Sequence, residues 1–430
     1  MSRFPYDAVV FDLDGTLCEA ETGIVSSVKV AMEQLGCEIP ADADLRLVVG
    51  PPLRDTFHVM LGVPENRVEE AMDYYRADFN NRGRFLYSVY PKIRTLLRML
   101  REGGVHTAVA TSKPLKLATD ILDYFALTPL FDVVMGEVEG PQKLGKPELI
   151  RRALPQTYER AAMVGDRKFD VEGAKAAGID GIGVAYGCGS MEELEQAGAT
   201  AIAESVDALC DLLCPGAEAP RGFFLTVEGP DGSGKTTQVD RLEANLRKFG
   251  FSVRRTREPG GCPISEAIRG IVLDAQNKEM CDTCEALLYA ASRAQHVHQV
   301  IRPAVENGEL VLCDRFVDSS VAYQGGGREL GVATIQQINA PAVDGMLPDA
   351  TLYLAIDHRV ALGRRLAVST PDRLESQTVE FHGRVQQAYE QLISEDVNRF
   401  LVVNAEQDRD SVEQDALKAV IDRISAYEQR

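Results

Sequence analysis

Residues 223–236 read Phe-Phe-Leu-Thr-Val-Glu-Gly-Pro-Asp-Gly-Ser-Gly-Lys-Thr, and this stretch decides the fold of the second half of the chain. Residues 223–227 form a mainly apolar run typical of a buried strand, and residues 229–236 match the pattern GxxxxGK[ST]. Glycines allow backbone N–H groups to converge on phosphate oxygens, and a following helix adds partial positive charge at its N-terminus. The stretch therefore predicts a strand, a phosphate-binding loop and a helix.

The residues of this loop predict a nucleotide site. Lys235 is expected to reach the β- and γ-phosphates, and Thr236 to offer its hydroxyl to Mg²⁺. A chance glycine-rich turn would not also have the strand, the lysine, the threonine and the helix in place. The expected ATP-binding residues are Gly229, Pro230, Asp231, Gly232, Ser233, Gly234, Lys235 and Thr236.

The strings that follow the loop indicate the phosphoryl acceptor. In order along the chain they are TREPGG (256–261), SEAIRGIVLD (265–274), EALLYAASR (285–293) and VLCDRFVDSSVAYQGGGR (311–328). From about Phe223 to the C-terminus, this order and spacing resemble bacterial thymidylate kinases. The resemblance implies a P-loop NTPase fold and the reaction of ATP with dTMP to give ADP and dTDP.

The same resemblance assigns roles to residues of the acceptor site. Tyr289 stands where the family stacks an aromatic ring on thymine, and Arg293, one helical turn on, would reach a base oxygen. Asp231 corresponds to the carboxylate near the sugar hydroxyl and the metal. The family pattern places Ser320, Tyr323 and Gln324 around base and sugar, and it places Arg257, Arg269 and Arg315 around the acceptor phosphate with Glu258 orienting them.

Catalysis by this family needs arginines and a metal carboxylate. Asp314 ends the predicted strand ELVLCD and resembles the carboxylate that serves Mg²⁺ in P-loop enzymes. The loop contains no arginine, so the likeness favours the arrangement with a lid segment, GRRLAVSTPDRLE (363–375), and with Arg373 as catalytic arginine. Lys235 and Arg315 complete the expected catalytic set, whereas Arg364 and Arg365 fit a lid and an exposed helix face equally well.

Four motifs in the first half predict hydrolysis of a phosphate ester. They are FDLDGTL (11–17), VATSKP (109–114), GKPE (145–148) and GDRKFD (165–170), and this ordered set resembles the haloacid dehalogenase superfamily. A lone DxD pair is common in turns, but four motifs in order, each after an apolar strand, are specific. The likeness spans roughly Met1 to Leu213.

The chemistry of that superfamily explains the residue types. Asp12 would be the nucleophile that forms an aspartyl-phosphate, and Asp14 would be the acid and base. Thr111 and Lys146 would hold the phosphoryl oxygens. The expected Mg²⁺ ligands are Asp12, Asp14, Asp166 and Asp170, since a metal lets a carboxylate approach an anionic phosphate.

Alternation of apolar runs with amphipathic stretches predicts the domain organisation. Both halves are expected to be α/β domains, each a Rossmann-like parallel sheet with helices on both faces. The predicted boundaries are a hydrolase domain at 1–214, with an inserted helical cap at about 19–87, a linker at 215–220 and a kinase domain at 221–430. The segment around the linker is rich in Pro, Gly and Ala and has no periodicity.

Composition limits the partners. A net charge of −19 argues against binding to duplex nucleic acid, and no apolar run is long enough for a membrane span. Nine cysteines without an export signal predict reduced thiols in the cytoplasm, and the single CxxC pair, Cys281 and Cys284, lacks the further ligands that zinc prefers. The expected partners are therefore ATP, dTMP and an unidentified phosphate monoester, with Mg²⁺ in both domains.

Three questions stay open at this stage. The first domain is either an active phosphatase, resembling phosphoglycolate phosphatases or 5′-nucleotidases, or a non-hydrolytic regulatory module. The kinase could also take another deoxynucleoside monophosphate as acceptor. Thymidylate kinases are generally homodimers, so the resemblance implies a homodimer through the kinase domain.

Overall fold

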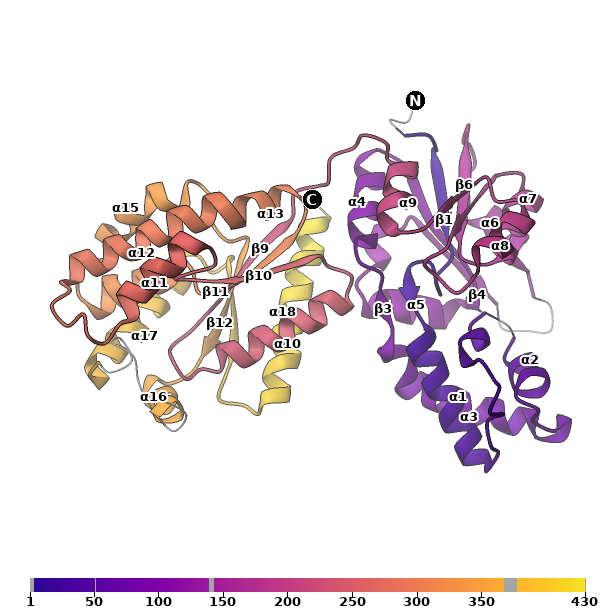
Figure 1. The fold of residues 1–430 in the computed structure, drawn as a ribbon, viewed down its shortest axis with the longest axis horizontal. Coiled ribbons are helices and arrows are strands. Elements are labelled where there is room, and N and C mark those ends of the chain that lie inside the picture. Colours follow the sequence, from indigo (N-terminus) through magenta and orange to yellow (C-terminus); the bar gives the residue numbers. More distant parts are fainter. Residues whose placement is uncertain (1–3, 51, 139–142, 367–376, 430) are drawn as a thin grey trace. The chain divides into compact units, whose positions relative to one another are not determined.

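The computed structural model divides the chain into two compact units, which are described separately. One unit comprises Met1–Glu218 and Lys248–Gly250, and the other comprises Ala219–Arg247 and Phe251–Arg430. The structure describes residues 4–50, 52–138, 143–366 and 377–429. Figure 1 shows a sheet with helices on both faces in each unit.

The N-terminal unit is built on a six-stranded parallel sheet with the order β5-β4-β1-β6-β7-β8. The central strands β1 and β6 are buried along their whole length, as expected for parallel strands covered on both faces. Helices α4 and α9 cover one face, and α6 and α7 cover the other (Figure 1). The strands are β1 (Ala8–Phe11), β4 (His106–Pro114), β5 (Val133–Glu137), β6 (Ala161–Gly165), β7 (Asp180–Val184) and β8 (Ala201–Ala203). The helices are α4 (Ile93–Glu102), α5 (Leu115–Tyr124), α6 (Lys146–Ala153), α7 (Lys168–Ala177), α8 (Met191–Ala197) and α9 (Val206–Leu213).

A helical insertion separates β1 from β4. Its long helices α1 (Glu21–Leu35) and α3 (Val68–Asn81) pack together, joined by a hydrogen bond from Ser27 Oγ to Asp78 Oδ2 of 2.7 Å. The short strands β2 (Cys18–Glu19) and β3 (Ser88–Val89) pair antiparallel where the insertion leaves and rejoins the sheet domain. The insertion also contains the short helix α2 (Leu53–Asp55). This arrangement places a helical layer beside the ends of β1 and β4.

The C-terminal unit is built on a five-stranded parallel sheet with the order β10-β11-β9-β12-β13. All six residues of the central strand β9 are buried. Helices α10 and α18 pack on one face of the sheet and are joined by an ion pair of 2.7 Å between Arg241 and Glu413 (Figure 1). The strands are β9 (Phe223–Glu228), β10 (Val253–Arg257), β11 (Leu310–Asp314), β12 (Ala350–Ala355) and β13 (Phe400–Asn404). The helices are α10 (Lys235–Lys248), α11 (Pro263–Leu273), α12 (Asp282–His296), α13 (Arg302–Glu306), α14 (Val317–Ser320), α15 (Val332–Val343), α16 (His358–Leu366), α17 (Val379–Glu395) and α18 (Arg409–Glu428), with a π-helical segment η7 (Val321–Gly327) after α14.

The predicted fold class is confirmed, because both units have parallel sheets with helices on both faces. Between them, α9 ends at Leu213 and β9 begins at Phe223. In the described part of the chain, no helix has both the length and the apolar character that a membrane crossing requires. In each sheet the polar residues of the motifs directly follow the central strands, so the two sites lie at the carboxyl ends of the strands.

Candidate active sites

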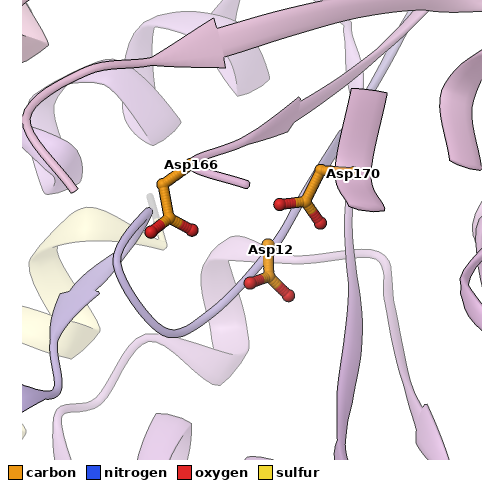
Figure 2. A group of neighbouring side chains, drawn as sticks. All are labelled: Asp12, Asp166 and Asp170. Atoms are coloured by element: carbon orange, nitrogen blue, oxygen red, sulfur yellow. The ribbon is translucent and has the colours of Figure 1, made fainter. Parts of the chain in front are cut away.

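Three aspartates converge at the carboxyl edge of the six-stranded sheet. Asp12 follows β1, while Asp166 and Asp170 lie between β6 and the first turn of α7. Their carboxylates each offer an oxygen, and these oxygens all lie within 4.8 Å of one another (Figure 2). Within the described residues, no other group of three or more acidic, histidine or cysteine side chains has this geometry.

Lysine 146 provides the positive charge of this cluster. Its Nζ lies 2.7 Å from Asp12 Oδ1 and 2.5 Å from Asp170 Oδ1. Burial would lower the pKa of Lys146, but the two aspartates outweigh that effect and raise it. One ammonium group therefore faces two carboxylates, and a third carboxylate is close by.

Burial and, after it, the crowding of like charges raise the pKa of two of the carboxyl groups. Burial, together with the charges of Asp170 and Asp12, raises the pKa of Asp166 to about 8. Burial also raises the pKa of Asp170 to about 6, although Lys146 opposes this shift. Three carboxylates so close together ionise readily only beside a cation, and carboxylate oxygens are the ligands that Mg²⁺ prefers. The residues of the cluster therefore fit a Mg²⁺ ion.

Glycines allow the backbone to approach this cluster. A Cβ on Gly15, which has a φ of +77°, would lie 2.1 Å from Asp166 Oδ2. A Cβ on Gly165 would lie 2.2 Å from Cβ of Asp170. No larger residue fits at these two positions without moving a metal-binding carboxylate.

Asp14 pairs with a lysine and is not one of the three converging aspartates. Its carboxylate pairs with Lys113 Nζ at 2.8 Å. The other oxygen of this carboxylate, Oδ1, is buried and has no hydrogen-bond partner among the described residues, and the role of Asp14 as a metal ligand stays a prediction. Lys113 in turn lies over the rings of Phe79 and Tyr87 from the helical insertion. Thr111 is buried on β4, and its Oγ1 accepts a hydrogen bond from the backbone N–H of Lys113.

Two adjoining pockets lie at the carboxyl edge of the five-stranded sheet. The first, here called the tyrosine pocket, is lined by Asp231, Glu258, Pro259, Arg269, Leu273, Tyr289, Arg293, Arg315, Phe316, Ser319, Ser320, Tyr323 and Gln324. The second, here called the loop pocket, is lined by residues 231–238 together with Arg257, Glu258, Arg269, Asp314, Arg315, Arg364, Arg365, Ala405, Gln407, Asp408, Arg409 and Val412. Both pockets are lined by Asp231, Glu258, Arg269 and Arg315, so they meet at these side chains.

The loop before α10 has the conformation that its sequence predicts. Gly232 has a φ of +89°, and a Cβ there would lie 2.0 Å from the carbonyl oxygen of Ala361. Lys235 is buried, and its Nζ donates hydrogen bonds to the carbonyl oxygens of Gly229 (3.0 Å) and Pro230 (2.8 Å). Burial and the charge of Arg315 lower the pKa of Lys235 to about 8. An anionic ligand at this loop would favour the charged lysine.

Two buried oxygens at the loop pocket have no partner among the described residues. One is Oδ1 of Asp314, at the end of β11, and the other is Oγ of Ser233. A buried polar atom without a partner is costly, and such atoms at functional sites commonly bind ligands. Asp314 and the adjacent Thr236 therefore offer oxygen ligands that fit a Mg²⁺ ion beside bound phosphates.

Arg315 joins the two pockets through a set of hydrogen bonds. Its guanidinium contacts the Asp231 carboxylate and donates to the Gly229 carbonyl (3.2 Å) and to Ser319 Oγ (3.0 Å). Tyr323 donates to the other oxygen of Asp231 at 2.8 Å. Burial would raise the pKa of Asp231, but the charges of Arg315 and Lys235 outweigh it and hold that pKa well below its ordinary value.

Arg293 is fully buried at the wall of the tyrosine pocket. It donates from Nε to Glu258 Oε2 at 2.8 Å, and from Nη2 to Phe316 O and Ser320 Oγ. Glu258 also accepts from His296 Nδ1 at 3.0 Å if that nitrogen carries the proton. Glu258 thus holds Arg293 and His296, and its predicted role in orienting the phosphate-site arginines stays a prediction.

The predicted phosphate-site arginines differ in how they are held. Arg257 is half exposed and pairs with both carboxylate oxygens of Glu266 at about 3 Å. Arg269 donates from Nη1 to the Pro259 carbonyl at 2.8 Å and lines both pockets. Arg364 is exposed and donates to the Ala405 carbonyl. The predicted catalytic Arg373 lies outside the described residues.

Several residues of these sites are not found by motif reasoning. Glu228 is buried at the end of β9 and accepts hydrogen bonds from Phe316 N, Ser319 Oγ and Tyr389 Oη. Burial, with the charge of Asp318, raises its pKa to about 7. In the sequence, the only feature that points to Glu228 is its position directly before the phosphate-binding loop.

Cys281 and Cys284 are exposed free thiols at the start of α12.

Each half of the chain matches a known protein family. A family model described as thymidylate kinase matches residues 227–416, and one described as haloacid dehalogenase-like hydrolase matches residues 9–184. The thymidylate kinase of Limosilactobacillus fermentum is 48% identical over 202 residues, which cover 46% of this chain and 94% of that protein. The thymidylate kinase of Deinococcus radiodurans is 47% identical over 203 residues, which cover 47% of this chain and 98% of that protein.

Solved structures match with similar coverage. A predicted phosphatase from Clostridium acetobutylicum is 40% identical, and the match covers 47% of this chain and 96% of that one with a TM-score of 0.43. A haloacid dehalogenase-like family hydrolase from Streptococcus pneumoniae is 28% identical, with 47% of this chain and 97% of that one covered and a TM-score of 0.43.

The chain therefore belongs to the thymidylate kinase family through its C-terminal half, and its N-terminal half is a haloacid dehalogenase-like hydrolase domain. Both predicted family resemblances are confirmed.

Proposed function

We propose that the C-terminal unit transfers the γ-phosphoryl group of ATP to dTMP, giving ADP and dTDP. The observation that carries this proposal is that the tyrosine pocket opens beside the phosphate-binding loop at Asp231 and Arg315. A monophosphate with its base on Tyr289 would place its phosphate at Arg269 and Arg315, next to the terminal phosphate of a nucleotide on the loop.

The residues at this junction suit phosphoryl transfer. Such transfer depends mainly on in-line positioning and on neutralising charge, and the protein supplies no nucleophile. Arg315 would hold the acceptor phosphate, and Asp231 would hold the sugar end of dTMP. Lys235 would exchange its two loop carbonyls for the β- and γ-phosphates. Mg²⁺ would be held by Thr236 and Asp314, where it neutralises phosphate charge.

We also propose that the segment 363–375 acts as a lid over ATP. Arg364 and Arg365 line the loop pocket, and Arg373 belongs to the same segment outside the described residues. Closure of an arginine-bearing segment over ATP would exclude water and suppress hydrolysis. We also propose a homodimer through the kinase unit, which light scattering of the purified chain tests directly.

The kinase proposal is tested by comparing acceptors. Initial rates of ADP formation should be measured for dTMP, dUMP, dCMP and dGMP at matched concentrations with ATP and Mg²⁺. We expect kcat/KM to be largest for dTMP. A preference for the purine dGMP would contradict the proposal and favour a kinase for another deoxynucleoside monophosphate.

For the N-terminal unit, we propose a Mg²⁺-dependent phosphatase that acts through an aspartyl-phosphate. Asp12 would attack the phosphorus of a monoester, so that the new bond to its carboxylate forms as the bond to the leaving oxygen breaks. Asp14 would give its proton to that oxygen and then take a proton from the attacking water, which releases phosphate and restores Asp12. Thr111 and Lys146 would hold the phosphoryl oxygens.

The metal of this site would be held by Asp12, Asp166 and Asp170. A bound Mg²⁺ supplies charge neutralisation, which allows the carboxylate of Asp12 to approach an anionic phosphate. The substrate is proposed to be a monoester other than dTMP, because hydrolysis of dTMP would remove the substrate of the kinase unit.

A phosphate-release screen over a panel of monophosphates tests the hydrolase. We expect Mg²⁺-dependent release from at least one compound, and no measurable release from dTMP. Release that is absent from the whole panel, or unchanged by Asp12→Asn, would favour the alternative of a regulatory N-terminal domain.

A further inference from the structure

One face of α12 brings three residues to the tyrosine pocket. Glu285, Tyr289 and Arg293 are four residues apart, so they share a side of the helix. Tyr289 and Arg293 line the pocket. Glu285 is fully buried, does not line the pocket, and contacts the lining residue Gln324.

The charge of Glu285 is balanced from outside the pocket. Arg328 Nη2 lies 3.1 Å from Glu285 Oε2, and the Nε of the same arginine lies 3.3 Å from Asp282 Oδ1. The Nε of Arg328 also donates to Glu285 Oε1 at 3.5 Å, and a guanidinium group can only donate, so both carboxylate oxygens of Glu285 act as acceptors. Glu285 is therefore an obligate hydrogen-bond acceptor.

An obligate acceptor fixes the side-chain amide of Gln324. The Nε2 of Gln324 donates to Glu285 Oε1 at 2.8 Å. The amide oxygen does not fit this position, since Glu285 Oε1 already acts as an acceptor for Arg328 and two acceptors would then face each other. With its NH₂ group turned toward Glu285, Gln324 has its oxygen Oε1 left to accept a hydrogen bond from a ligand in the pocket. Gln324 is 1% exposed, so an alternative orientation would have to be accommodated inside the protein.

Arg293 supplies the opposite hydrogen-bonding character. Four hydrogen bonds use its N–H groups, with Glu258, Asn339, Phe316 and Ser320 as acceptors. A guanidinium has five N–H groups, so these bonds leave one N–H, on Nη1, for a ligand of the pocket that Arg293 lines. The pocket therefore presents a donor from Arg293 and an acceptor from Gln324.

We propose that Glu285 is a positioning residue that fixes the Gln324 amide and thereby selects a base with an imide edge. Such an edge places a C=O beside a ring N–H, which matches the donor of Arg293 and the acceptor of Gln324. Cytosine presents a ring-nitrogen acceptor beside an amino donor, the reverse of that pattern. The inference rests on the proposed function, because it names how the acceptor site of that kinase discriminates between pyrimidines.

The variant Glu285→Gln tests this role in the full chain. Its neutral amide can donate or accept, so Gln324 becomes free to turn either atom toward the pocket. Dissociation constants for dTMP and dCMP are measured by calorimetry for both chains. We expect the preference for dTMP over dCMP to fall by about tenfold or more, because an unmatched buried polar pair weakens binding by at least that factor. We expect kcat with saturating dTMP to stay within about threefold.

A matched control is available on the same helix. Asp282→Asn also removes a partner of Arg328, but Asp282 is half exposed and has no hydrogen bond with Gln324. Its dTMP/dCMP preference should equal that of the wild type. In a double-mutant cycle, Gln324→Leu should remove the effect of Glu285→Gln, since Glu285 acts through that amide.

Two outcomes would overturn the inference. One is an unchanged dTMP/dCMP preference in folded Glu285→Gln, and the other is full additivity with Gln324→Leu. If Glu285→Gln does not fold, Glu285→Asp keeps the charge for Arg328 but withdraws the carboxylate from Gln324, and the preference should again fall. If the wild type binds dTMP without phosphorylating it, the proposed function fails, while the binding preference still tests the role of Glu285.

Discussion

The carboxyl edge of the six-stranded sheet brings three carboxylates together beside Lys146, whereas that of the five-stranded sheet brings Asp231, Arg269 and Arg315 into the shared lining of two pockets. Both sheets are parallel, and in both the polar residues follow the central strands. Under the two proposed functions, the difference lies in the origin of the nucleophile. A hydrolase with an aspartate nucleophile must bring negative charge to a phosphate, so it needs a cation. A kinase receives its nucleophile from the acceptor, so cationic side chains can surround the phosphates.

The comparison also shows how each site keeps its charge in place. In the hydrolase unit, burial together with neighbouring carboxylates raises the pKa values of Asp166 and Asp170. In the kinase unit, neighbouring cations hold the pKa of Asp231 low. The same residue type is therefore poised to accept a metal in one unit and to stay ionised among arginines in the other.

Removing the nucleophile should have the largest effect. Asp12→Asn replaces the attacking carboxylate with an amide, and we expect phosphate release to fall by about 10⁴-fold or more. Phosphate release and dTDP formation are measured in the same preparations. The rate of dTDP formation should not change, and a parallel loss of both activities would contradict the assignment of two separate sites.

The reciprocal test removes the cation that joins the two kinase pockets. Arg315→Met keeps much of the side-chain volume but not the charge, and we expect kcat/KM for dTMP to fall by about 10³-fold. The coupled assay for ADP measures this loss, and Arg302→Met, a variant of a surface arginine paired with Asp344, is the control. Retention of more than a tenth of the wild-type activity would remove Arg315 from the catalytic set.

A steric change beside Asp166 should lower phosphatase activity by a smaller factor than the loss of a charged group. Gly15→Ala would place a Cβ 2.1 Å from Asp166 Oδ2 and displace that carboxylate, so we expect phosphatase activity to fall by about 100-fold. Gly36→Ala is the matched control, because Gly36 also has a positive φ (+66°) but an open surrounding. Equal losses in the two variants would mean that backbone strain, not displacement of Asp166, is responsible.

The smallest predicted effect concerns pH and the buried Glu228. Its pKa of about 7 in the folded state lies above the ordinary value of 4.5 for a glutamate, so the folded state binds the proton more tightly. The contribution to stability is therefore present below pH 4.5 and is lost as the pH rises to about 7, by roughly 3 kcal/mol. Glu228→Gln should remove this dependence. Calorimetry at pH 5 and pH 8, following the transition that dTMP shifts, measures it, and identical pH slopes in the two chains would contradict the assignment.

Motif reasoning predicted the fold and the positions of charge-bearing residues because both depend on local order along the chain. Residues that follow the central strands of a parallel sheet meet at one edge, so Asp12, Asp166, Asp231 and Asp314 could be placed by their position in sequence. The family resemblances and the fold class are confirmed, whereas the individual site roles stay predictions.

The partners of these residues could not be predicted in the same way. Lys113 pairs with Asp14 although they lie 99 positions apart in the sequence, and Asn339 binds Arg293 from a helix with no motif of its own. Such pairs depend on how elements pack in three dimensions, and no spacing along the chain encodes them. Glu285 is the first residue of the motif EALLYAASR, but its proposed role follows only from its contacts with Gln324 and Arg328.

One measurement tests the central claim, that this chain carries a thymidylate kinase beside a phosphatase of different specificity. The wild-type chain is incubated with ATP, dTMP and Mg²⁺, and all phosphorus species are followed by ³¹P nuclear magnetic resonance. We predict that dTDP and ADP form in equal amounts, without matching growth of inorganic phosphate. Inorganic phosphate that accumulates at the expense of dTMP, with no dTDP signal, would contradict the account.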